Sequence, residues 1–199
     1  MIAVIDYGMG NLRSVEKAFA FLGYDVCVTN DARKIRDASH LVLPGVGAIA
    51  DALTHLKQRG LFEEIIAQSR TGKPFLGICL GMQLLFDKSF ENGEHKALGL
   101  VPGAVQPFSC TGLRIPHMGW NTLKTNASPL FEQENPCVYF VHSYHAAQVP
   151  KEYVSATTEY GYGFVSAVQK DNVYGLQFHP EKSGDTGLAM LKLFGGLKA

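Results

Sequence analysis

The sequence has no excess of charge of either sign and no long hydrophobic run. Its 199 residues carry 18 Lys and Arg against 18 Asp and Glu, so the formal net charge at pH 7 is zero. No basic arm is visible, which argues against binding to nucleic acid or to an anionic membrane surface. No apolar run approaches the ~20 residues that cross a bilayer. The N-terminus lacks the basic segment of a signal peptide, so we expect a cytoplasmic protein.

Cysteine is scarce, and its spacing excludes the common cysteine frameworks. The four cysteines, Cys27, Cys79, Cys110 and Cys137, form no Cys-x-x-Cys pair, so neither a structural zinc site nor a disulfide scaffold is indicated. We expect Cys27, Cys110 and Cys137 to be buried thiols that act as small hydrophobic groups. Cys79 differs from them because of the residues around it.

No metal or cofactor is expected either. Gly8 and Gly10 follow a predicted strand, but Arg13 stands where a dinucleotide-binding loop needs a third glycine. His142 and His145 are residue types that bind metals, but the sequence suggests no third ligand for them.

The pattern of apolar residues predicts an α/β fold. In the first half, strand-like runs alternate with helical spacing: strands at 2–6, 24–28, 40–43 and 74–78, and helices at 11–22, 49–56, 62–66 and 82–86. This alternation predicts a mostly parallel open sheet with helices on both faces. The second half predicts a mixed or antiparallel extension with a final helix, from strands at 98–108, 137–141, 153–158, 164–168 and 173–178 and a helix at 185–197. We interpret residues 1–199 as a single domain.

One segment, Gly77-Ile78-Cys79-Leu80-Gly81, has the pattern of a nucleophile elbow. It follows an apolar strand, precedes a helical pattern, and has glycines where a tight strand-to-helix turn needs close backbone approach. Such a turn presents its central side chain at the carboxyl end of a strand, where open α/β sheets bind ligands. N–H groups at the start of the helix favour a thiolate and can face an oxyanion. The alternative is a structural cysteine in a glycine-rich packing turn.

A cysteine nucleophile needs a nearby base, and His179 is the best candidate among the seven histidines. Within 175–181, apolar residues alternate with Gln177 and His179, so a strand places these two side chains on one face. Pro180 favours an extended His179 and ends the strand. If the chain stays extended, Glu181 lies on the same face and can orient the imidazole ring. The alternative is a strand-ending turn with a solvated Glu181.

The motifs Gly-Ile-Cys-Leu-Gly-Met-Gln at 77–83 and Phe-His-Pro-Glu at 178–181 resemble those of the triad-type, or class I, glutamine amidotransferases. The resemblance extends from the first predicted strand to the last helix. Segments at 5–12, 43–47, 116–121 and 139–144 are similar to the branch of the family that supplies ammonia for histidine biosynthesis. The resemblance implies a flavodoxin-like fold and cofactor-free hydrolysis of glutamine to glutamate and ammonia through a cysteine thioester.

The resemblance also assigns roles to individual residues. It implies a catalytic set of Cys79, His179 and Glu181, oxyanion-hole residues Leu80, Gly45 and Val46 (within Gly45-Val46-Gly47), and glutamine-binding residues Gln83, Ser143, Tyr144 and Glu91. In this branch ammonia passes directly to a (β/α)8-barrel synthase subunit in a heterodimer, which prevents its loss as ammonium in water. The matching interface positions are Asn11, Trp120, Tyr139 and Lys182. For each of these four, packing or plain solvation is the alternative.

Three other functions stay open at this stage. A paralogous glutaminase would have the same catalytic domain but would feed a different ammonia-dependent synthase. A non-catalytic subunit would only bind and activate a partner. A stand-alone cysteine hydrolase would cleave γ-glutamyl bonds without any partner. The three differ in which protein copurifies and in whether glutamine turnover needs that protein.

Overall fold

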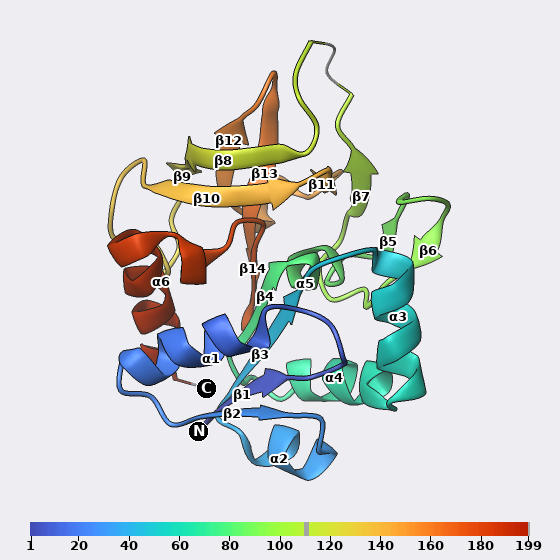
Figure 1. Cartoon of the computed structure of the whole chain (residues 1–199), viewed down its shortest axis with the longest axis vertical. Coiled ribbons are helices and arrows are strands. Elements are labelled where there is room, and N and C mark those ends of the chain that lie inside the picture. Colours follow the sequence, from blue (N-terminus) through green and yellow to red (C-terminus); the bar gives the residue numbers. More distant parts are fainter. Residues whose placement is uncertain (110–111, 199) are drawn as a thin grey trace.

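A block of parallel strands forms the centre of the protein (Figure 1). The computed structural model describes residues 1–109 and 112–198, so Cys110 lies outside the described residues. The strands are ordered β2 (Val26–Thr29), β1 (Ile2–Ile5), β3 (His40–Gly45), β4 (Phe75–Cys79) and β14 (Val173–Leu176), and each neighbouring pair is parallel. Every residue of β1, β3, β4 and β14 is buried, as expected for strands covered on both faces.

Helices cover both faces of this block (Figure 1). On one face lie α1 (Leu12–Phe21) and α6 (Gly184–Gly196), and on the other lie α2 (Ala32–Asp37), α3 (Ile49–Gln58) and α4 (Leu61–Ser69). Val15 and Phe19 of α1 pack with Phe194 of α6 in one buried cluster, while Leu53 and Ile65 belong to the cluster on the opposite face. These side chains recur at helical spacing, so burial of one apolar stripe stabilises each helix on the sheet.

Beyond β14 the sheet continues with mixed direction. The order is β13 (Gly163–Lys170), β11 (Tyr144–Ala147), β7 (Ala104–Pro107), β5 (Lys88–Ser89) and β6 (His95–Lys96). Strand β12 (Val154–Glu159) also pairs with β13, and β9 (Lys124–Thr125) pairs with β12. A short 3-10 helix, η1 (Lys151–Tyr153), precedes β12. A separate antiparallel pair, β8 (His117–Thr122) and β10 (Cys137–His142), lies above α1 in Figure 1. The predicted fold class is therefore confirmed.

Some predicted elements are wrong in their bounds. The helix predicted over 82–86 is instead α5 (Leu80–Gln83), which begins immediately after β4 and lasts one turn. The carbonyl group of Leu85 accepts hydrogen bonds from the N–H groups of Leu100 and Val101, so this backbone pairs with a distant loop instead of continuing the helix. The same loop explains why the predicted strand over 98–108 is reduced to β7. Helix α2 was not predicted, because only one of its residues, Ile35, is buried.

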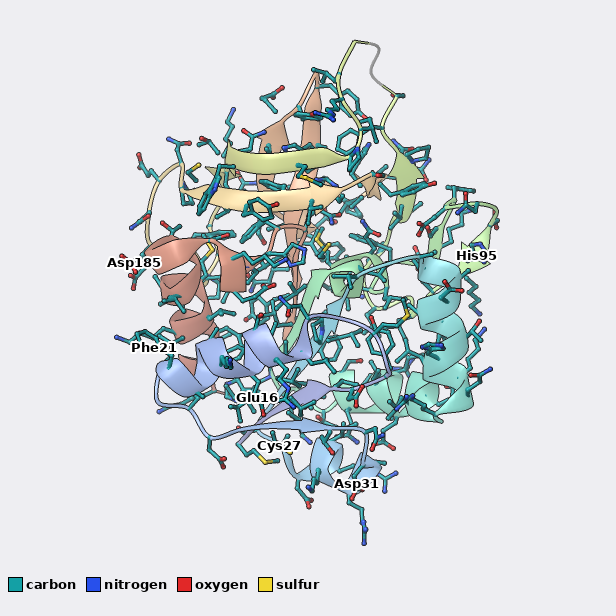
Figure 2. The ribbon with its side chains drawn as sticks, viewed as in Figure 1. Glu16, Phe21, Cys27, Asp31, His95 and Asp185 are labelled. Atoms are coloured by element: carbon teal, nitrogen blue, oxygen red, sulfur yellow. The ribbon has the colours of Figure 1, made fainter. Side chains whose placement is uncertain are left out.

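Two cysteines are more exposed than the sequence suggested. Cys27 is half-buried on the edge strand β2, and Figure 2 shows it beside that strand near the rim of the molecule. Cys137 is exposed at the start of β10. Cys27 lies on an edge strand and Cys137 begins a strand of a two-stranded sheet, so the prediction of buried thiols was wrong for both. Among the described residues, no helix is long and apolar enough to cross a membrane.

Candidate active site

Cys79 stands at the turn between β4 and α5 with a positive φ (φ 55°, ψ −109°), which is uncommon for a residue other than glycine. The flanking glycines are required by space. A Cβ on Gly81 would lie 1.7 Å from the carbonyl oxygen of Leu43, and a Cβ on Gly77 would lie 2.6 Å from that of Gly81. The glycines therefore allow β3, β4 and α5 to approach closely. The resulting turn presents the thiol at the carboxyl end of β4.

Strand β14 brings a second group of polar side chains to the same edge of the sheet. Leu176 lies opposite Ile78 in parallel register, so the following residue, Gln177, reaches the level of Cys79. The Nε2 atom of Gln177 lies 3.8 Å from Sγ of Cys79, although the two residues are 98 positions apart in the sequence. Two residues further along, His179 follows on the same side.

His179 is buried between Cys79 and Glu181. Its Nδ1 lies 2.8 Å from Oε1 of Glu181, and the two side chains are only 2% and 1% exposed. Burial by itself lowers the pKa of His179, but Cys79 and the Glu181 carboxylate outweigh burial and raise it from 6.5 to about 9. Nε2 forms no well-aligned hydrogen bond with the described residues. Since Nδ1 faces Glu181, Nε2 is the nitrogen that is available to exchange a proton with Cys79.

Glu181 reaches His179 by a different route from the one the sequence suggested. It lies on the 3-10 turn η2 (Pro180–Lys182), so the expectation of an extended chain through Glu181 was wrong. His179 itself is extended, as predicted (φ −102°, ψ 95°). Oγ of Ser183 donates to the carbonyl group of His179 at 2.7 Å and accepts from the N–H of Tyr139 at 3.0 Å. This pair of bonds anchors the turn to β10 and holds the imidazole in place.

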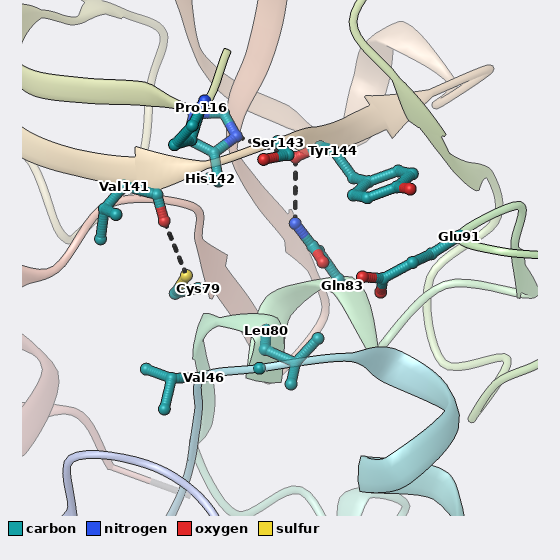
Figure 3. Close-up of a pocket in the computed structure, with 11 residues that line it drawn as sticks. Val46, Cys79, Leu80, Gln83, Glu91, Pro116, Val141, His142, Ser143 and Tyr144 are labelled. Carbon is teal, nitrogen blue, oxygen red and sulfur yellow. Dashed lines mark hydrogen bonds between the residues drawn. The ribbon is translucent and has the colours of Figure 1, made fainter.

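The thiol borders a cavity of about 350 Å³, a size typical of small-molecule sites (Figure 3). The cavity is lined by Val46, Gly47, Cys79, Leu80, Gln83, Glu91, Pro116, Val141, His142, Ser143 and Tyr144. It therefore gathers the glutamine-binding residues predicted from the sequence and two of the three predicted oxyanion residues. Among the described residues, no group of three or more His, Cys, Asp or Glu is arranged to hold a metal ion.

The side-chain amide of Gln83 is fixed by two hydrogen bonds. Its Nε2 donates to the carbonyl oxygen of Tyr144 and to Oε1 of Gln177, both at 3.0 Å (the first is drawn in Figure 3). Gln83 is 4% exposed and Gln177 is fully buried. Gln177 thus links Gln83 to the sulfur of Cys79. The sequence placed Gln177 on the face of His179 but did not single it out as a site residue.

The predicted oxyanion residues come from the end of β3 and the start of α5, which meet at Cys79. Leu80 opens α5, and Val46 follows β3 with 41% of its surface exposed. The N–H of Val46 donates to no described residue. Gly45 ends β3 opposite Cys79 in parallel register and lies behind the cavity wall. An unpaired N–H beside the nucleophile can bind an oxygen atom that carries developing negative charge.

Glu91 lines the cavity, but part of its carboxylate is already occupied. Its Oε2 accepts the N–H of Ile49 at 2.8 Å, at the start of α3. Figure 3 shows the carboxylate extending toward the end of the cavity where Gln83 and Tyr144 lie. Glu91 therefore caps the start of α3 and also places a negative charge at the end of the cavity remote from Cys79.

A chain of neutral histidines supports the carbonyl group of Tyr144 and was missed by sequence analysis. Nδ1 of His142 lies 2.8 Å from this oxygen and must carry a proton to bond with it. Nε2 of His142 then accepts from Nδ1 of His117 at 3.0 Å, and Nε2 of His117 accepts from the amide of Asn121 at 3.3 Å. Burial lowers the pKa of His142 to about 3 and of His117 to about 4. No periodicity in the sequence indicates this pairing.

The four predicted interface residues come from elements that pack together. Trp120 of β8 lies opposite Tyr139 of β10, with ring centroids 6.2 Å apart, and Trp120 is 58% exposed beside Met118 at 62%. Lys182 is exposed on η2, which contacts both β10 and α1, and Asn11 immediately precedes α1. Asn11 occupies the cap position, but its side chain makes no capping hydrogen bond. The outward face of β8 and β10 is thus an exposed apolar surface beside the cavity.

Comparison with known proteins places this arrangement in context. Residues 3–195 match the family model described as glutamine amidotransferase class-I. The chain is 51% identical to the imidazole glycerol phosphate synthase subunit HisH of Caldanaerobacter subterraneus subsp. tengcongensis, over 98% of this chain and 97% of that protein. It is 50% identical to the protein of the same name from Sulfurimonas denitrificans, again over 98% and 97%.

Solved structures share the fold at much lower identity. One described as a glutamine amidotransferase superposes with a TM-score of 0.78 at 19% identity, covering 98% of this chain and 100% of that one. PurLQS from Thermotoga maritima gives a TM-score of 0.77 at 23% identity, with 97% and 96% coverage.

Proposed function

Because the chain belongs to the class I glutamine amidotransferase family, we propose that it is the glutaminase subunit of an imidazole glycerol phosphate synthase, which hydrolyses glutamine and passes ammonia to a synthase subunit for histidine biosynthesis. Relatives of that name are about half identical to it over nearly their whole length. The observation that carries the proposal is the buried pair of His179 and Glu181 beside Cys79, whose thiol borders the cavity.

In the first step, Cys79 attacks the side-chain amide carbon of glutamine as a thiolate. The raised pKa of His179 favours an imidazolium beside the sulfur at neutral pH. A protonated His179 next to Cys79 stabilises the thiolate and can then donate its proton to the leaving nitrogen. The carbon–nitrogen bond breaks, ammonia departs, and the acyl group remains on Cys79 as a thioester.

In the second step, water resolves the thioester. Neutral His179 accepts a proton from the attacking water, glutamate leaves, and the thiolate–imidazolium pair is restored. Glu181 keeps Nδ1 of His179 bonded at 2.8 Å throughout, which fixes Nε2 toward the sulfur. The sum of the two steps is glutamine plus water giving glutamate plus ammonia.

The cavity supplies the remaining interactions in this proposal. The N–H groups of Val46 and Leu80 bind the oxyanion of each tetrahedral intermediate. Gln83 and the Ser143–Tyr144 backbone hold the amino-acid end of glutamine, and the charge of Glu91 suits its α-ammonium group. All of these residues line the same cavity, so a single bound glutamine can reach them together.

A partner subunit is the second part of the proposal. Ammonia released into water becomes ammonium, which is a poor nucleophile, so direct transfer favours biosynthesis. The exposed apolar side chains of Met118 and Trp120 lie on the β8–β10 face beside the cavity, as expected for the centre of a protein interface. We assign this face, with Asn11, Tyr139 and Lys182, to a (β/α)8-barrel synthase in a heterodimer. In this proposal the present chain carries out the hydrolysis of glutamine, and the barrel carries out the lyase reaction that uses the ammonia.

A cytoplasmic location fits the same chemistry. A thiolate nucleophile works only while it stays reduced, and cytoplasmic thiol systems maintain that state.

The test is glutamate release from glutamine by the purified chain, alone and with the barrel subunit encoded in the same genome, with and without that subunit's substrate. We expect slow turnover by the chain alone and strong stimulation in the loaded complex. Full activity without a partner would indicate a stand-alone hydrolase instead. Stimulation by a different copurifying synthase would indicate a paralogous glutaminase.

A further inference from the structure

Tyr7 carries a buried hydroxyl group without a partner. The residue follows β1, its side chain is 0% exposed, and its hydroxyl forms no hydrogen bond with the described residues. Buried hydroxyl groups are nearly always paired, because leaving one unpaired costs stability. Nothing in its packing against the cluster of α3 and α5 requires a polar atom at this point. The unpaired hydroxyl therefore needs an explanation, and its position suggests one.

The hydroxyl lies directly against Gly45, on the side away from the cavity. A Cβ built on Gly45 would be 2.5 Å from the Tyr7 oxygen and 2.9 Å from Cβ of Leu80. Val46 and Leu80 line the glutamine cavity, whereas Tyr7 does not. Burial, and after it the charge of Cys79, raise the pKa of Tyr7, so the hydroxyl keeps its proton and acts as a donor.

A planar trans peptide determines what this donor can meet. In the peptide between Gly45 and Val46, the carbonyl oxygen and the N–H point in opposite directions. When the Val46 N–H faces an oxyanion in the cavity, the Gly45 carbonyl must face the interior, where the Tyr7 hydroxyl lies. An unpaired carbonyl in that place would oppose the catalytic orientation.

We propose that Tyr7 is a positioning residue for the oxyanion hole: its hydroxyl donates to the Gly45 carbonyl when the Gly45–Val46 peptide turns its N–H toward the oxyanion. This inference rests on the proposed glutaminase function. One hydrogen bond then pairs two groups that would otherwise be unpaired in the interior. Tyr7 does not line the cavity and its hydroxyl forms no hydrogen bond with Cys79, so it acts only through the peptide.

The test is the Tyr7→Phe variant in the complex with the barrel subunit. We expect kcat for glutamine hydrolysis to fall about ten-fold, the loss that corresponds to one hydrogen bond of ordinary strength. KM should change less than about two-fold, because hydrogen bonds to glutamine itself are intact. The thermal midpoint should stay the same or rise, because the deleted hydroxyl has no partner in the resting protein. Alkylation of Cys79 by iodoacetamide, which forms no oxyanion, should keep its rate.

Tyr24→Phe is the matched control. The Tyr24 hydroxyl donates to the carbonyl group of Lys192 at 2.8 Å. Tyr24 precedes the start of β2, whereas Cys79 lies at the carboxyl end of β4, the opposite edge of the parallel block. This variant should lower the thermal midpoint and leave kcat unchanged, which is the reverse of the Tyr7→Phe signature.

Two results would overturn the inference. One is wild-type kcat in Tyr7→Phe, since the hydroxyl would then have no role in turnover. The other is a loss of kcat with an equal loss in iodoacetamide reactivity and thermal midpoint, since that would indicate general damage. Wild-type turnover in the same assay tests the proposed function separately. If the wild type hydrolyses glutamine and Tyr7→Phe is unaffected, only the role of Tyr7 is contradicted. If the wild type does not hydrolyse glutamine, the glutaminase function is contradicted as well.

Discussion

Leu176 of β14 lies opposite Ile78 of β4 in parallel register, although 98 residues separate them in the chain. This pairing brings His179 to Cys79, because Cys79 ends β4 and His179 follows β14 at the same carboxyl edge of the sheet. It also makes β14 the junction of the fold, parallel to β4 on one side and antiparallel to β13 on the other. The catalytic arrangement is thus a consequence of sheet register.

Replacing Cys79 with Ala should lower glutamine-dependent turnover by a factor of about 10³ or more, because no thioester can form. Synthesis by the complex from added ammonium should remain, since the barrel subunit is untouched. The comparison is made by measuring glutamate release and product formation in parallel. Cys27→Ala is the control, because Cys27 is half-buried on the edge strand β2, away from the cavity. A Cys79→Ala protein that still hydrolysed glutamine would refute the assignment of the nucleophile.

Replacing Glu181 with Gln should change how stability depends on pH. The folded pKa of His179, about 9, lies above its ordinary value of 6.5, so this histidine stabilises the fold fully below about pH 6.5. That stabilisation is lost as pH rises through 9. The variant lacks the carboxylate charge, so its free energy of unfolding should be lower than that of wild type near pH 6. This difference in unfolding free energy should become smaller above pH 9. Urea unfolding across this range measures the difference, and a gap that widened toward high pH would contradict the assignment.

Replacing Gln83 with Leu should raise KM for glutamine about ten-fold, because the Tyr144 carbonyl and Gln177 each lose a hydrogen bond of ordinary strength. Stability should also fall by about 1–3 kcal/mol, since Oε1 of the buried Gln177 is left without this donor, whereas the Tyr144 carbonyl keeps its bond from His142. Steady-state kinetics and urea unfolding report the two effects. An unchanged KM would show that this amide network does not shape the glutamine site. Gln58→Leu, at the end of α3, is a surface control.

Replacing Gly81 with Ala should prevent correct folding of the elbow or cost more than about 4 kcal/mol. The new Cβ would lie 1.7 Å from the Leu43 carbonyl oxygen, and neither backbone can move away without breaking β3 or α5. Gly196→Ala is the matched control, because its nearest contact would be the Tyr24 hydroxyl at 4.0 Å. Thermal unfolding of the two variants gives the comparison. Equal midpoints would show that the elbow is far more plastic than the packing indicates.

Replacing Trp120 with Ala should weaken binding of the barrel subunit by about 2–4 kcal/mol, as for a central aromatic residue of an interface. The fold should be little affected, because Trp120 is 58% exposed. Calorimetric titration measures the affinity, and thermal unfolding checks the isolated chain. Phe21→Ala provides the control: Phe21 is 78% exposed at the other end of α1 from Asn11 (labelled in Figure 2). If both substitutions weakened binding equally, the β8–β10 face would not be the specific docking surface.

Some features follow from the sequence alone. The alternation of apolar strands and amphipathic helices predicted the parallel block, because a strand covered on both faces must be apolar throughout. The spacing of Gly77, Cys79 and Gly81 predicted the elbow, because only glycine fits where strands and helix meet so closely. Pro180 predicted the extended conformation of His179, although the strand itself ends earlier than predicted, at Leu176. Each of these depends on interactions between near neighbours in the chain.

Other features were decided only by the tertiary structure. The length of α5 depended on whether Leu85 bonded within a helix or to the loop at Leu100, and both were locally possible. Gln177 became part of the site through the register of β14 with β4, and Tyr7 through the packing of a loop beneath Gly45. The histidine chain from Asn121 to the Tyr144 carbonyl joins separate strands. The physical reason is common to all of these: pairing and burial between distant segments depend on how the whole chain closes, and no local spacing encodes that.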